Sequence, residues 1–143
     1  ATPLLIGAVG SRYDLTINSL YFEGKTPTTL PVGTLESLHE SRLARAIPLF
    51  VRHSARSAPV VGTTIDYFEF RGLKLAEGRS LAILGDCVVG YEVARRLELK
   101  PGDTLITDRE SLFDIAGPMP LRMKVVGIFQ PSRSADDRAV FVD

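Results

Sequence analysis

The sequence has little of the residues that most often carry chemistry or cross-links. Its 143 residues include one cysteine, two histidines and no tryptophan. The single cysteine, Cys87, excludes a disulfide within the chain and a cysteine-based metal site. It begins an apolar run, Cys87-Val88-Val89, which predicts a buried thiol rather than a reactive nucleophile.

Net charge and long apolar runs are also missing. With 17 basic and 17 acidic residues the formal net charge is zero, so no strong field would attract nucleic acid or an anionic membrane surface. No apolar run approaches about 18 residues, so we expect no membrane span within these residues. The sequence starts abruptly at Ala1 and stops at Asp143 inside an expected strand. We therefore expect it to be a piece of a longer protein.

What is present is typical of a soluble globular chain. Apolar residues make up 45% and charged residues 24% of the composition. This length favours one domain or two small lobes, and such a chain can bury a core without disulfides.

Recognisable catalytic and cofactor patterns do not occur. His39 and His53 belong to no zinc-binding spacing, and no Gly-x-Ser-x-Gly elbow exists. Gly7-Ala8-Val9-Gly10-Ser11 resembles a phosphate-binding turn, but it lacks the lysine and third glycine, and we expect no clear helix after it. Asp136-Asp137 is interpreted as a solvated turn. We therefore assign no catalytic, cofactor-binding or metal-binding residues and predict that the chain is not an enzyme.

Residues 90–103 carry the clearest local signal. Val93, Ala94 and Leu97 recur at helical spacing, and Pro101-Gly102 then forces a turn. This pattern predicts a strand, a short helix, a turn and another strand.

Elsewhere, short strands and helices are interspersed. We expect a buried strand at 4–9, an ambiguous segment leaning towards strand at 14–22, and a helix at 35–43 with Thr34 as its N-cap. Further strands are expected at 46–51, 59–65, 72–78, 121–129 and 139–142, with 52–57 as a polar connection and a short helical turn at Tyr67, Phe68 and Phe70 packed in the core. The fold class predicted is α+β with a mixed sheet.

The long polar segment 107–120 contains three apolar residues that we do not place in the core. Leu112, Phe113 and Met119 are predicted to form a partner-contact loop. The alternative is a loop folded down onto the sheet.

Several motifs in order resemble one family of membrane-transport proteins. Together they are similar to the extracytoplasmic core domain of ABC transporter permeases of the MacB, FtsX and lipoprotein-release type. The matching pieces are Gly7–Ser11, Val61–Thr64 with Asp66–Phe68, Leu75–Arg79, Val88–Gly90 with Val93–Asp103, Lys124–Phe129 and Asp137–Val142.

The resemblance implies a fold, a location and partners. One lobe would be mixed α/β and porter-like, about 1–71 with 131–143, and a small β-rich lobe carrying a short helix would span about 72–130. The domain would lie on the periplasmic face of the cytoplasmic membrane and have no cofactor. Its partners would be a second permease copy, a cytoplasmic ATPase subunit reached through membrane helices, and a periplasmic adaptor or substrate carrier, but no nucleic acid. It would couple ATP hydrolysis to export, extraction or signalling outside the membrane.

Two other interpretations stay open. Leu99-Lys100-Pro101-Gly102-Asp103-Thr104 also resembles the turn before strands in double-psi barrels, which would make the chain a soluble small β-barrel binding or enzyme-accessory module without a lobe boundary near Gly72. A serine–histidine hydrolase would need His53 within hydrogen-bond reach of a serine and a carboxylate.

Overall fold

A computed structural model describes residues 4–42, 44–109 and 119–143. Its helices are α1 (Arg12–Tyr21), α2 (Val32–Ser41), α3 (Ile65–Arg71), α4 (Tyr91–Leu97) and the 3-10 helix η1 (Ala135–Arg138). Its strands are β1 (Phe50–Ala55), β2 (Ala58–Gly62), β3 (Leu75–Gly78), β4 (Asp86–Val89), β5 (Thr104–Ile106), β6 (Arg122–Phe129) and β7 (Val140–Val142).

The seven described strands form one mixed sheet in the order β1-β2-β7-β4-β6-β3, with β5 also paired to β6. The β2–β7 and β4–β6 pairs are parallel, and the remaining pairs are antiparallel. The predicted α+β class is therefore confirmed. Among the described strands β1 and β3 end this path without pairing to each other, so the closed barrel of the alternative interpretation is wrong.

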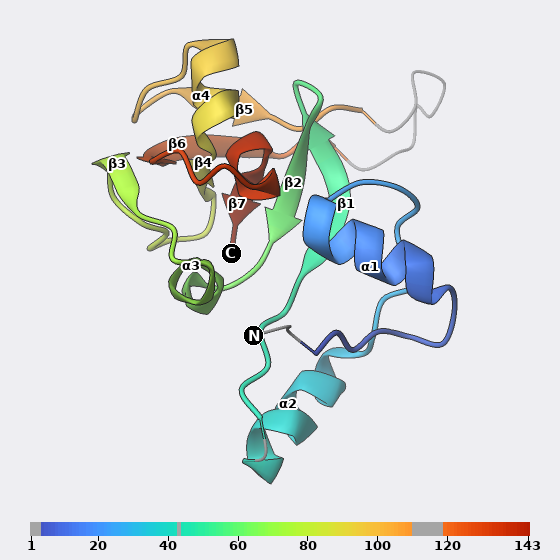
Figure 1. The fold of residues 1–143 in the computed structure, drawn as a ribbon. Helices are drawn as coiled ribbons and strands as arrows, with labels where there is room; N and C mark the ends of the chain where they lie inside the picture. The colour runs from blue at the N-terminus through green and yellow to red at the C-terminus, as the bar shows by residue number, and fades with distance from the viewer. Residues whose placement is uncertain (1–3, 43, 110–118) are drawn as a thin grey trace.

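Side chains alternate across the sheet and build a core on each face. Cys87 and Val89 of β4 pack on the face covered by α4, whereas Val88 packs on the face covered by α3. Figure 1 shows α4 and α3 on opposite sides of the strands. Phe141 of β7 lies at the centre of the α3 face, with ring centroids 5.5 Å from Phe68 and 5.8 Å from Phe129.

The predicted lobe boundary falls inside this sheet. β3, β4, β5 and β6 come from the predicted second lobe, and they are hydrogen-bonded into the same sheet as β1, β2 and β7. A division into lobes stays a prediction.

The expectations for the first 22 residues were wrong. Residues 4–9 form no strand, and Leu4 and Val9 are exposed, so this apolar run is not a core element. Residues 12–21 form α1 instead of a strand, and a helix therefore does follow Gly7–Ser11. The Ser11 hydroxyl caps this helix by accepting the Asp14 N–H at 3.1 Å, a local contact that outweighs the β preference of Thr16 and Ile17.

Other boundaries move by a few residues or change type. α2 begins at Val32 after Pro31, so Thr34 is not its cap. β1 begins only at Phe50, and residues 52–55, expected to be a polar connection, complete that strand because they pair with β2. In α3, Tyr67 and Phe68 are buried as predicted, but Phe70 is exposed.

Candidate functional site

The predicted contact loop leaves the sheet at the end of β5 and returns at the start of β6. Leu112 and Phe113 lie outside the described residues. Met119 is described, and 87% of its surface is exposed. Ile106 and Leu121, on the two sides of the loop base, are also exposed. An apolar surface therefore exists at this point, and its role in binding stays a prediction.

Backbone bonds hold the two sides of the loop base together. Thr107 N–H donates to the Leu121 carbonyl at 3.0 Å, and Leu121 N–H donates to the Thr107 hydroxyl oxygen at 2.8 Å. Thr107 is itself buried. These bonds fix Thr107 and Leu121, on the two sides of the loop base, relative to each other.

Asp108 attaches this base to the turn between β1 and β2. Its carboxylate accepts the Ser54 hydroxyl at 2.8 Å, the Arg56 N–H at 3.0 Å and the Ser57 N–H at 3.1 Å. Its own N–H donates to the Ser54 carbonyl at 2.7 Å. Partial burial opposes ionisation, but the bonds from Ser57, Ser54 and Arg56 lower the pKa of Asp108.

The same turn is tied to α4. Arg56 and Ser57 both have positive φ, 50° and 66°, which is uncommon for residues with a side chain. The Arg96 guanidinium donates to the Arg56 carbonyl at 2.9 Å, so α4, the β1–β2 turn and the loop base form one connected end of the molecule. Figure 1 shows this end at the top, away from the C-terminus. Sequence reasoning missed Asp108 because Ser54 is 54 residues away.

A cleft of about 790 Å³ lies beside this end, between α1, the β1–β2 hairpin and α4. Buried apolar side chains form its floor, and arginines from β1, α4 and η1 stand at its rim. No sequence motif indicated it, because its walls come from four separate segments.

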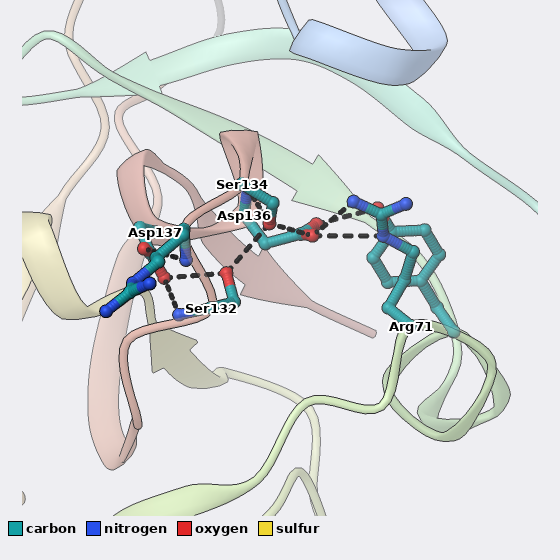
Figure 2. Close-up of polar contacts among 7 residues, drawn as sticks. Arg71, Ser132, Ser134, Asp136 and Asp137 are labelled. Carbon is teal, nitrogen blue, oxygen red and sulfur yellow. Dashed lines mark hydrogen bonds and ion pairs between the residues drawn. The ribbon is translucent and has the colours of Figure 1, made fainter.

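Asp136 is the centre of a buried polar network, so the expectation of a solvated turn at Asp136-Asp137 was wrong. Its side chain is 2% exposed and accepts bonds from Tyr67 Oη at 2.8 Å, Arg71 Nε at 3.0 Å and Arg71 Nη2 at 2.8 Å. Figure 2 shows Arg71 of α3 reaching the carboxylate of Asp136 in η1. Burial, with the Asp136 charge adding to it, raises the pKa of Tyr67.

Asp137 is buried and satisfied from the preceding loop. Its carboxylate accepts the Ser132 hydroxyl, the Ser132 N–H and the Arg133 N–H, each at 2.8 Å. Asp136 thus joins η1 to α3, and Asp137 joins η1 to the loop before it. Because protein donors already occupy these oxygens, the two carboxylates offer no ready cation site. Among the described residues, no group of three His, Cys, Asp or Glu side chains is arranged to hold a metal ion.

Glycines in the resembling motifs bring backbones into contact. A Cβ on Gly90 would lie 2.2 Å from the Asp136 carbonyl oxygen, and one on Gly78 would lie 2.1 Å from that of Val126. Arg79 then bonds to Asp86 at 2.6 Å, and this bond, opposed by burial, lowers the pKa of Asp86 to about 2. These motif residues build the fold.

The residues considered for catalysis are Cys87, His39 and His53, and the structure shows the surroundings of each. Cys87 is fully buried as predicted, and burial, with a smaller contribution from Asp86, raises its pKa to about 12, which suppresses thiolate chemistry. The exposed His39 ring pairs with the Ala46 carbonyl at 3.1 Å. Half-buried His53 is next to Ser54, whose hydroxyl donates to Asp108.

Within the described part of the chain, no helix combines the length and apolarity needed to cross a membrane. This finding bears on the described helices alone.

Comparisons with known proteins agree on one family. The model of the MacB-like periplasmic core domain matches residues 6–143. No curated protein matches the chain.

Two solved structures share the fold. The periplasmic region of MacB from Actinobacillus actinomycetemcomitans matches with a TM-score of 0.60 and 17% identity, over 79% of this chain and 54% of that one. The extracellular domain of the noncanonic ABC-type transporter YknZ from Gram-positive bacteria matches with a TM-score of 0.58 and 14% identity, over 92% of this chain and 67% of that one. The chain thus spans about half of the MacB region.

Proposed function

The chain belongs to the family of MacB-like periplasmic core domains, and from this membership we propose that it serves as the extracytoplasmic domain of an ABC transporter permease subunit. In this role it couples ATP hydrolysis in the cytoplasm to export, extraction or signalling outside the membrane. The match over residues 6–143 is the observation that carries the proposal. The likeness to the MacB and YknZ domains supports it at the level of fold.

The proposed location and partners follow from the same membership. The domain lies on the outer face of the cytoplasmic membrane, faces a second permease copy and responds to a cytoplasmic ATPase subunit through membrane helices of the full-length protein. A periplasmic adaptor or substrate carrier contacts its exposed end. The formal net charge of zero favours none of the electrostatic contacts that nucleic acid would need.

We propose a mechanical and not a catalytic role. β7 pairs with β2 on one side and β4 on the other, so a displacement of β7 is passed to strands on both sides of it. The Asp136 network attaches α3 to the segment just before β7. Both features support movement of the sheet as one body.

The proposal is tested in the full-length permease reconstituted with its ATPase. A spin label at Met119→Cys reports the distance between two copies, and buried Cys87 stays unlabelled. We expect the distance distribution to shift between the nucleotide-free and ATP-bound states, and an ATPase that cannot bind ATP serves as the control. An unchanged distribution in a permease that transports would overturn the mechanical role.

The contact loop is tested separately. Alanine at Leu112, Phe113 and Met119 together should reduce partner binding and transport. Ile83→Ala with Leu84→Ala is the matched control, because these exposed apolar side chains lie elsewhere, between β3 and β4. If the triple variant binds and transports as well as this control, the loop is not a contact site.

A further inference from the structure

The cleft between α1, the β1–β2 hairpin and α4 has the dimensions of a ligand site. Its volume of about 790 Å³ falls within the range of roughly 300–1,000 Å³ typical of small-molecule sites. α1 contributes Asn18 and Tyr21, and α4 contributes Val93 and Arg95. The walls therefore come from elements far apart in the sequence.

The floor of the cleft is apolar. It is lined by Phe22, Val51, Ala58 and Val93, all of them buried in the fold. Phe22 is held there by its ring contact with Phe141, with centroids 6.1 Å apart. An apolar portion of a ligand would lose water against this floor, which favours binding.

The rim carries an excess of positive charge. Arg52, Arg95, Arg96 and Arg138 line the cleft, against two carboxylates, Glu23 and Glu92. Glu23 is 3.7 Å from the Arg138 guanidinium, and Arg96 donates to the Arg56 carbonyl. The Arg95 guanidinium has no hydrogen bond or ion pair with any described residue. Its planar donors are suited to paired bonds with a carboxylate or phosphate.

One buried polar side chain in the wall has donors and acceptors to spare. Asn18 of α1 lines the cleft, and the residue is 7% exposed. Its side-chain amide makes no hydrogen bond with the described residues. No buried side-chain nitrogen or oxygen in the described part of the chain lacks a partner, so the unbonded Asn18 amide atoms are accessible to solvent and add a polar group to the cleft wall.

We propose that this cleft binds an amphiphilic anion, a ligand with one carboxylate or phosphate group on an apolar chain. The apolar chain lies on the floor formed by Phe22 and Val93. The anionic group meets Arg95 at the rim, where its charge offsets the unpaired guanidinium. All of the lining residues belong to the described chain, so binding at this site can be tested apart from the proposed transporter role.

Calorimetric titration of the 143-residue chain tests the site with four probes below their critical micelle concentrations. Dodecyl phosphate and dodecanoate carry both features of the proposed ligand, dodecyl maltoside lacks the charge, and inorganic phosphate lacks the apolar chain. We expect at least one of the two anionic amphiphiles to bind at least about tenfold more tightly than either partial probe. Preference between them distinguishes a phosphate-bearing from a carboxylate-bearing source.

Arg95→Gln should weaken binding of the tighter probe by about tenfold or more, since hydrogen bonds to charged groups contribute that much. Arg122→Gln is the matched control, because Arg122 is exposed on β6 and lies outside the cleft. Both substitutions are on the surface, and unchanged thermal unfolding shows that each variant is folded. Equal binding of dodecyl maltoside, or equal loss in the two variants, would overturn the proposal.

Discussion

The N-terminal arm (residues 4–42 and 44–49) and the sheet body (residues 50–109 and 119–143) are built on different principles. In the arm, α2 has no buried residue and α1 buries only Asn18. In the body, every residue of β4 is buried, and so are the last five of β6. Stability is therefore concentrated in the body, whereas the arm mainly supplies surface.

The contacts that hold the arm differ in kind from those inside the body. Arg45 forms exposed ion pairs with Asp66 and Glu69 of α3, and such surface pairs contribute little. Among the described residues of the arm, Phe22 is the buried apolar side chain: it is 5% exposed and packs on Phe141, and Ile47 and Leu49 pack partly buried on the same core. The arm can therefore adjust while the sheet stays intact, and each of the first three predictions below sets a change in the body against a matched change in the arm.

The largest effect is expected at Phe141. This fully buried ring contacts four other aromatic rings, so Phe141→Ala leaves a cavity and should lower the free energy of unfolding by about 3–5 kcal/mol. Tyr13→Ala on α1 removes a ring that is 74% exposed and should change it by less than about 0.5 kcal/mol. Urea unfolding measures both, and similar losses would break the comparison.

The next effect is at Asp136. Asp136→Asn removes the charge that faces the partly buried Arg71 guanidinium and should cost about 2–3 kcal/mol. Glu36→Gln on α2 is the control, since this side chain is exposed. A cost at Asp136 no larger than at Glu36 would mean that the buried network does not stabilise the α3–η1 junction.

Replacing glycine by alanine should lower the stability in the body and raise it in the arm. Gly90→Ala places a Cβ against the Asp136 and Asp137 carbonyl oxygens and should destabilise the chain by about 1–3 kcal/mol. Gly33→Ala meets nothing within 4 Å and lies in α2, where alanine is favoured over glycine by roughly 0.5–1 kcal/mol. Thermal melts of the two variants compare the signs directly, and destabilisation by both would contradict the contrast.

The smallest effect is on how the stability depends on pH. The folded state holds the pKa of Asp86 at about 2, below the usual value of about 3.9, so it favours the charged carboxylate. This contribution is present above about pH 4 and is lost as the pH falls towards 2. The stability of the Asp86→Asn variant should therefore fall less steeply as the pH is lowered. Urea unfolding midpoints between pH 6 and pH 2.5 measure this slope. Parallel midpoint curves for the two proteins would contradict it.

Much of the body could be predicted from the sequence, because its signals are local. Val93, Ala94 and Leu97 define the buried face of α4, and the apolar run at Cys87–Val89 gives β4. The order of motifs also indicated the family, which the match over residues 6–143 confirms.

The arm and the site were harder to predict for physical reasons. The run at 4–9 has the composition of a buried strand, but no strand pairs with it and Val9 is fully exposed. α1 begins at the Ser11 cap, but its apolar residues show only a weak helical spacing, so the sequence pattern did not indicate the helix. The Asp108 contacts and the arginine rim of the cleft join segments distant in sequence, so no local pattern announces them.

Native-state hydrogen exchange tests the division between a stable body and an adjustable arm most directly. Amides paired within β4, β6 and β7 should exchange only through global unfolding, with the same free energy as urea unfolding gives. Amides of α2 should exchange at least about 100-fold faster through local opening. Equal protection of α2 and β4 would contradict this division, because the arm would then unfold only together with the sheet.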